Sequence, residues 1–262
     1  MLKDITIGQH FPGNSILHRM DPRLKIMLTM GYVIVLFIGS NIIGLTISTL
    51  FVSTLYFMAK ISIRIIIKSI KPIIPIIIFT AFINLFFVPG EALWSWWIIT
   101  ITKEGINYSI LMSVRIICLI CGTSILTYTT SPIVLTDAIE RLLSPFAKIK
   151  LPVHELAMMM TIALRFIPTL IDETDKIMNA QKARGAMLDS GTLKERVKAI
   201  VPVLIPLFIS AFRRADELAM AMECRCYHGG EGRTRMKQLK LTSLDFYILI
   251  CALIIYLIIA FS

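Results

Sequence analysis

Residues 26–59 read IMLTMGYVIVLFIGSNIIGLTISTLFVSTLYFMA and contain no charged side chain. A membrane-spanning helix needs about 20 apolar residues, so this run is long enough for two short spans. We place the turn between them at Gly39-Ser40-Asn41, with one strongly tilted helix as the alternative. The run lacks the strict alternation of barrel strands. It therefore predicts an α-helical membrane protein, because only helices and closed barrels satisfy their backbone in lipid.

Three further uncharged runs follow, over residues 72–90, 116–136 and 246–262. Together with the first run they predict about five transmembrane helices, the fourth over 105–130 and the fifth over 241–261. The composition agrees, because 56% of the 262 residues are hydrophobic, against roughly 45–50% in soluble domains. The fold class is therefore predicted to be all-α and polytopic.

The charges of the loops predict an orientation. Residues 60–71 carry basic side chains at helical spacing with isoleucine on the other face, which is typical of an amphipathic helix on the inner leaflet. The tryptophan-containing loop 91–104 holds two acidic residues and one basic residue, so it faces outward. We expect a multi-pass protein of a prokaryotic plasma membrane, with the N-terminus and the region after Thr130 in the cytosol.

The formal net charge of +10 does not require a nucleic acid. Basic residues in cytosolic loops lie beside an anionic leaflet, which accounts for the excess. No basic stretch alternates with stacking aromatic residues, as a groove for a nucleic acid strand would require. We therefore expect the lipid bilayer, and no nucleic acid, among the partners.

Between the fourth and fifth spans lie two long amphipathic patterns, over 152–188 and 193–227. Prolines interrupt both, so we expect both helices to bend. They are more apolar than free cytosolic helices, and we expect a helical hairpin half-buried at the membrane surface. Two further spans are the alternative, although the apolar run 199–212 is too short to cross. The chain is thus predicted in three parts: residues 1–130, 131–240 and 241–262.

Each long pattern ends with one arginine between small residues, in Ala183-Arg184-Gly185 and in Cys224-Arg225-Cys226. When the arginines are aligned, Asp175 and Asp216 also coincide, nine positions earlier. An arginine on a smooth helix end can form a bidentate bond with a partner's carboxylate. The alternative is two ordinary helix ends, since basic residues favour a C-terminal turn through the helix dipole.

The sequence has no recognisable catalytic, cofactor or metal site. It lacks a GxxxxGK[ST] phosphate loop, and its four histidines have no metal-ligand spacing. Cys118 and Cys121 lack a second ligand pair and are expected to pack within a span. Cys224 and Cys226 are expected to be free thiols in the cytosol. Arg115 lies inside the fourth span, where snorkelling, a structural pairing and a transport role all fit.

The sequence resembles the transmembrane T components of energy-coupling factor (ECF) transporters, the CbiQ/EcfT-like family. The similarity rests on residues 12–25 (PGNSILHRMDPRLK), on Ala183-Arg184-Gly185, and on residues 223–235 (ECRCYHGGEGRTR). The departure is in the second motif, where Cys224 and Cys226 stand in place of alanine and glycine. A cysteine at the glycine position puts a left-handed backbone there in doubt.

The resemblance implies a non-catalytic scaffold that joins two ATP-binding-cassette (ABC) ATPases to a substrate-binding S component for vitamin or metal ion uptake. Each long helix would be a coupling helix that inserts its arginine end into one ATPase. The docking residues implied are Ala183, Arg184, Gly185, Cys224, Arg225 and Cys226. One alternative is a self-sufficient carrier. Another is a membrane-embedded enzyme that binds a lipid phosphate through four arginines: Arg213, Arg214, Arg233 and Arg235.

Overall fold

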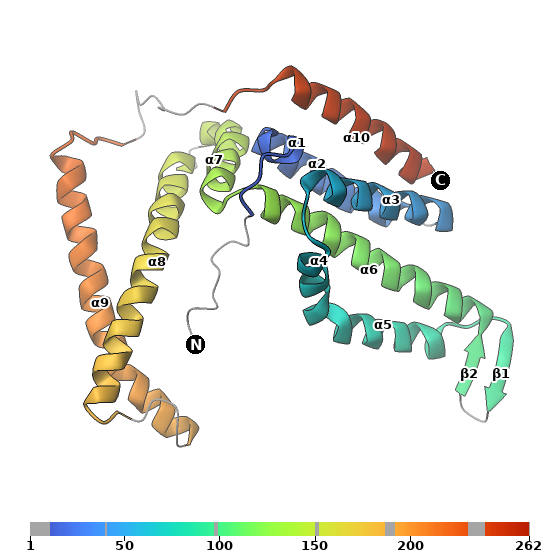
Figure 1. Ribbon diagram of the computed structural model, residues 1–262, viewed down its shortest axis with the longest axis horizontal. Coiled ribbons are helices and arrows are strands. Elements are labelled where there is room, and N and C mark those ends of the chain that lie inside the picture. Colours follow the sequence, from blue (N-terminus) through green and yellow to red (C-terminus); the bar gives the residue numbers. More distant parts are fainter. Residues whose placement is uncertain are drawn as a thin grey trace. The chain divides into compact units, whose positions relative to one another are not determined.

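The computed structural model describes residues 11–39, 41–96, 99–149, 152–186, 192–229 and 239–261. These residues are mostly helical (Figure 1), which confirms the predicted all-α polytopic class. The chain divides into a membrane unit, Gly8–Ala138 with Leu239–Ser262, and a coupling unit, Met1–Ile7 with Ile139–Gln238. The predicted three-part domain division stays a prediction.

The membrane unit contains most of the apolar helices. They are α1 (Ile16–Arg19), α2 (Pro22–Ile38), α3 (Ile42–Ala59), α4 (Ile63–Ile70), α5 (Ile74–Phe87), α6 (Lys103–Thr129) and α10 (Ser243–Phe261). The first uncharged run forms α2 and α3, so the alternative of one tilted helix is wrong. Ser40, in the predicted turn between them, lies outside the described residues.

Five described helical stretches are long and apolar enough to cross a membrane: 42–59, 63–87, 103–129, 153–183 and 243–261. Four of them overlap predicted spans. The difference lies in α2, which has 17 residues and is not among the five, and in 153–183, which we expected at the membrane surface.

The stretch from α4 to α5 changes direction at a short 3-10 helix, Lys71–Ile73 (Figure 1). On α4, isoleucines 65, 66 and 70 pack against the core of the membrane unit, while Arg64 and Lys68 are exposed. This is the amphipathic helix that the spacing of its basic residues predicts. By contrast, α5 has no buried residue, and within the membrane unit it packs mainly on α6.

Buried tyrosines hold the core of the membrane unit together. The Tyr32 hydroxyl lies 2.8 Å from Ser48 Oγ and donates to the carbonyl of Cys118 at 3.3 Å. Tyr56 donates to the carbonyl of Cys121, and Tyr256 to that of Leu28, each at 2.9 Å. Each hydroxyl thus has a partner where an unpaired polar group would be costly. Cys118 and Cys121 are buried, as predicted.

Arg115 donates a hydrogen bond of 2.7 Å to the carbonyl of Gly39, the C-cap residue of α2. Carbonyls at a helix end have no intrahelical partner, so a cation suits this position. Of the roles open for Arg115, the structure shows the structural pairing.

The loop expected between the third and fourth spans contains an antiparallel pair of strands, β1 (Ala92–Trp96) and β2 (Ile99–Thr102). Thr102 also accepts a hydrogen bond from the backbone N–H of Gly105 and so caps the start of α6. Aromatic and β-branched residues favour strands, and this signal was present in the sequence.

Helix α7 (Pro132–Leu143) and a 3-10 helix (Ser144–Ile149) precede the two long helices of the coupling unit, α8 (Val153–Ala183) and α9 (Leu193–Glu223). Both long helices continue through their prolines. The two helices run in opposite directions and cross (Figure 1), and Glu173 of α8 contacts Ser210 and Arg214 of α9. The predicted capping box of Thr192 with Glu195 is present at the start of α9.

Candidate docking ends of α8 and α9

The end of α8 is closed by backbone hydrogen bonds around Arg184. The N–H of Gly185 donates to the carbonyl of Lys182, and the N–H of Ala186 to that of Gln181, both at 3.0 Å. Gly185 has a φ of +87°. This pair of bonds and the left-handed residue define a Schellman motif, which satisfies carbonyls that a helix end leaves free.

The end of α9 repeats this pattern around Arg225. The N–H of Cys226 donates to the carbonyl of Glu223 at 2.9 Å, and the N–H of Tyr227 to that of Met222 at 3.1 Å. Cys226 has a φ of +54°. Arg184 and Arg225 therefore occupy equivalent positions, each directly before the left-handed residue. The repeat predicted from sequence is also a repeat of backbone conformation.

The doubt about a left-handed backbone at Cys226 is thus wrong. A cysteine adopts it at some cost, because its Cβ approaches the following carbonyl oxygen. The hydrogen bonds of the motif compensate for this strain. The backbone preference of a single residue is weaker than these hydrogen bonds. A cysteine in place of glycine therefore does not show that the left-handed conformation is lost.

The candidate docking residues at both ends are exposed: Ala183, Arg184, Gly185, Cys224, Arg225 and Cys226. Within the part of the chain that the structure describes, neither guanidinium has an ion-pair or hydrogen-bond partner. Space around Gly185 is open, since a Cβ placed there would meet nothing within 4 Å. Both arginines are therefore available to another molecule.

Because α8 and α9 run in opposite directions, their C-terminal ends lie at opposite ends of the crossed pair (Figure 1). Between them, Glu173 accepts hydrogen bonds from Ser210 at 2.5 Å and from Arg214 at 2.6 Å. Gln181 also donates to the carbonyl of Pro202 at 3.3 Å. These polar contacts fix the register of α8 against α9. Sequence reasoning missed them, since it treated each helix alone.

The arginines proposed to bind a lipid phosphate do not form a described site. The Arg214 guanidinium pairs with Glu173, so part of its charge is already neutralised. Arg213 is exposed on the same helix. Arg233 and Arg235 lie outside the described residues.

The comparisons with known proteins agree with one another. Residues 13–236 match the family model of CbiQ, described as a cobalt transport protein. An energy-coupling factor transporter transmembrane protein EcfT from Ruminiclostridium cellulolyticum is 58% identical over 245 residues, covering 94% of this chain and 92% of that protein. The EcfT proteins of Clostridium kluyveri and Bacillus subtilis are 53% and 44% identical, over 97% of this chain and 95% and 97% of their own lengths.

The chain belongs to the CbiQ/EcfT family. It is a transmembrane T component of an ECF transporter, as the sequence resemblance predicts.

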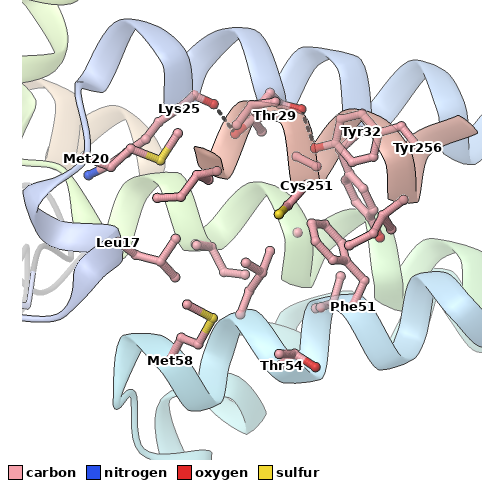
Figure 2. Close-up of a pocket in the computed structure, with 18 of the residues that line it drawn as sticks. Leu17, Met20, Lys25, Thr29, Tyr32, Phe51, Thr54, Met58, Cys251 and Tyr256 are labelled. Carbon is pink, nitrogen blue, oxygen red and sulfur yellow. Dashed lines mark hydrogen bonds between the residues drawn. The ribbon is translucent and has the colours of Figure 1, made fainter. Parts of the chain in front are cut away.

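One pocket of the membrane unit lies among α2, α3, α6 and α10, and most of the side chains that line it are apolar (Figure 2). Lys25 is at one end, and Tyr32, Phe51 and Tyr256 are at the other. Among the described residues, no group of three or more His, Cys, Asp or Glu side chains is placed to hold a metal ion.

Proposed function

We propose that this T component is the energy-coupling scaffold of an ECF-type importer. Two cytosolic ATPases bind the ends of α8 and α9, and a substrate-binding S component associates with the scaffold for the uptake of a vitamin or metal ion. The supporting observation is the repeated helix end: two separate Schellman motifs, each presenting one exposed arginine. Two equivalent ends suit two equivalent partners.

The chemistry of each end suits a carboxylate in a groove. The Schellman motif stops the helix at the arginine, so the guanidinium lies at the tip. Small neighbours at Ala183, Gly185 and Cys224 let a partner's backbone approach closely. A bidentate pair of arginine and carboxylate is geometrically specific, and desolvation in a groove strengthens it. Removal of one partner of such a pair costs about 2–5 kcal/mol.

The crossed pair suits the transmission of force. Glu173 joins α8 to α9 through two short hydrogen bonds to its carboxylate, one from a neutral hydroxyl and one from the charged Arg214. Hydrogen bonds to charged groups contribute about 1.5–3 kcal/mol each. A displacement of one helix end by its ATPase is then carried to the other helix rather than absorbed between them. ATP hydrolysis itself belongs to the partners.

The proposed location is a prokaryotic plasma membrane, with the coupling unit in the cytosol. The charge asymmetry between residues 60–71 and the tryptophan-containing loop supports this orientation. It is tested with Gly185→Cys in intact cells. An impermeant external thiol reagent should not label this cysteine, and labelling would reverse the topology.

The central test is the double change Arg184→Glu and Arg225→Glu. We expect the variant to insert in the membrane but to lose co-purification of both ATPases, because each new carboxylate repels the one it should bind. Arg213→Glu is the matched control, since Arg213 is exposed on α9 but lies away from either end. ATPase binding that survives the double change would refute the docking role.

The two alternatives are tested with the purified single chain. An enzyme acting on a lipid phosphate would turn over its substrate without partners. A self-sufficient carrier would support uptake in vesicles that contain this protein alone. The scaffold predicts neither activity.

A further inference from the structure

After Gly8, the chain passes twice between the membrane unit and the coupling unit. It leaves through α7, directly after the end of α6, and it returns at Leu239, just before α10. These two connections are covalent routes by which a force on the coupling unit can reach the membrane unit. Both are contacted by one short stretch, Asp21–Lys25, at the start of α2.

Lys25 contacts the outgoing connection. Its Nζ donates to the carbonyl of Thr129 at 3.2 Å and to Thr130 Oγ1 at 3.1 Å, at the C-terminal end of α6. Lys25 is only 7% exposed. A buried ammonium is costly unless it is paired and hydrogen-bonded, and a free carbonyl at a helix end suits it. Lys25 also lies near the carboxylates of Asp21 and Asp245, which compensate its charge.

Arg23 contacts the returning connection. Its guanidinium donates to the carbonyl of Leu239 at 3.4 Å, where the chain re-enters the membrane unit. The same guanidinium pairs with the Asp21 carboxylate, with 2.7 Å between Nη2 and Oδ2. Asp21 is buried. The ion pair with Asp21 therefore orients the Arg23 guanidinium toward the carbonyl of Leu239.

Asp245 joins the start of α10 to the start of α2. One of its carboxylate oxygens accepts from the backbone N–H of Asp21 at 3.0 Å. The other accepts from the N–H and the hydroxyl of Thr242, at 2.9 and 2.8 Å. Asp245 is only 2% exposed, and its bond to Asp21 spans 224 positions of sequence. The two carboxylates and two cations of this group balance in charge.

We propose that Asp21, Arg23, Lys25 and Asp245 form a junction clamp, whose residues position both chain connections so that motion of the coupling unit moves the membrane helices. This inference rests on the proposed function. Helix capping alone would need Asp21 and Asp245, but it would not need two cations that reach the two connections. A clamped connection transmits a displacement, whereas a slack one absorbs it.

The test compares Lys25→Met with Arg115→Met in the complete reconstituted transporter. Both changes remove a cation that binds a helix-end carbonyl. Lys25 is buried and Arg115 is partly buried, but Arg115 binds Gly39, away from the connections. We expect Lys25→Met to keep both ATPases bound and ATP hydrolysis active, while substrate uptake per ATP falls at least about fivefold, the low end of typical coupling between sites. Arg115→Met should keep the wild-type ratio, and Lys25→Arg should restore part of it.

Thr130→Val provides a milder second variant if Lys25→Met lowers the yield. It removes one acceptor of Lys25 and no charge, and we expect a smaller loss of uptake per ATP. An unchanged ratio in the assembled Lys25→Met or Thr130→Val transporter would overturn the clamp, as would an equal loss in Arg115→Met. Failure of the proposed function is recognised separately, because the wild-type chain would then bind no ATPase.

Discussion

The ends of α8 and α9 share a backbone conformation but differ in the residue that adopts the left-handed φ. At the end of α8 this residue is Gly185, for which the conformation costs little. At the end of α9 it is Cys226, for which the same conformation is strained. The position of the arginine is nevertheless the same. The comparison teaches that the hydrogen bonds of the motif, rather than the glycine, determine where the arginine lies.

The largest effect is expected from the single changes Arg184→Glu and Arg225→Glu. Because the two ends are equivalent, each change should remove one ATPase and leave the other bound. The expected loss at the altered end is about 2–5 kcal/mol. Native mass spectrometry of the purified complex gives the stoichiometry directly. If one change released both ATPases and the other released none, the ends would not be equivalent.

A smaller effect, on the stability of each helix end, is expected when the left-handed residue is changed. Its sign should be opposite at the two ends. Cys226→Gly should stabilise the end of α9 by about 1 kcal/mol, because it relieves the strained φ. Gly185→Cys should destabilise the end of α8 by a similar amount. Hydrogen exchange of the Tyr227 and Ala186 amides reports these changes, since each amide closes its own motif. Faster exchange of Tyr227 in Cys226→Gly would contradict the strain.

Only the α9 end carries thiols. Cys224 and Cys226 are exposed, so we expect both to react with a maleimide in the purified chain, while the buried Cys118 and Cys121 do not. A bound ATPase should slow the reaction of the exposed pair by roughly tenfold or more, since docking buries the core of an interface. Peptide mass spectrometry with and without ATPase measures this protection. Equal labelling in both samples would place the partner elsewhere.

The smallest effect is expected for the ion pair of Arg23 with Asp21, in which both partners belong to this chain. Burial raises the pKa of the Asp21 carboxyl, but hydrogen bonds and charge from Arg23 outweigh it, so the pKa lies below its ordinary value of 3.8. The pair therefore stabilises the fold at neutral pH, and this contribution is lost as the pH falls below 3.8 through the lowered pKa.

Thermal unfolding in detergent checks this sign. The wild-type chain should exceed Asp21→Asn in stability at pH 7, and the difference should shrink toward pH 3. A difference that grows on acidification would contradict the assignment. The result also measures how much stability one arginine–carboxylate pair contributes in this protein. That value can be compared with the loss of ATPase binding at the ends of α8 and α9.

Local signals in the sequence predict much of this fold. Absence of charge over residues 26–59 predicts two spans because only length and polarity decide insertion. The spacing of basic residues predicts α4, and Thr192 with Glu195 predicts the start of α9. The helix ends are less accurate: the patterns run to 188 and 227, whereas α8 ends at Ala183 and α9 at Glu223. Apolar periodicity continues past the motif, and only hydrogen bonding ends the helix.

Contacts between distant residues were beyond local reasoning. The pairing of α8 with α9 through Glu173 and the meeting of Asp21 with Asp245 depend on tertiary packing, which periodicity does not encode. The equivalent positions of Arg184 and Arg225 were predictable because the sequence around them is repeated. The left-handed backbone at Cys226 was not, because glycine is the residue expected there. The roles of Arg184 and Arg225 stay predictions until their partners are tested.

The absence of any buried residue in α5 has a consequence for how this protein tolerates sequence change. The core forms among α2, α3, α6 and α10, where Tyr32, Tyr56 and Tyr256 each have a specific acceptor. Substitutions there must preserve both volume and a hydroxyl. Along α5, one aliphatic side chain can replace another with little penalty. The sequences of homologous chains should therefore diverge most in α5, while its residues stay hydrophobic.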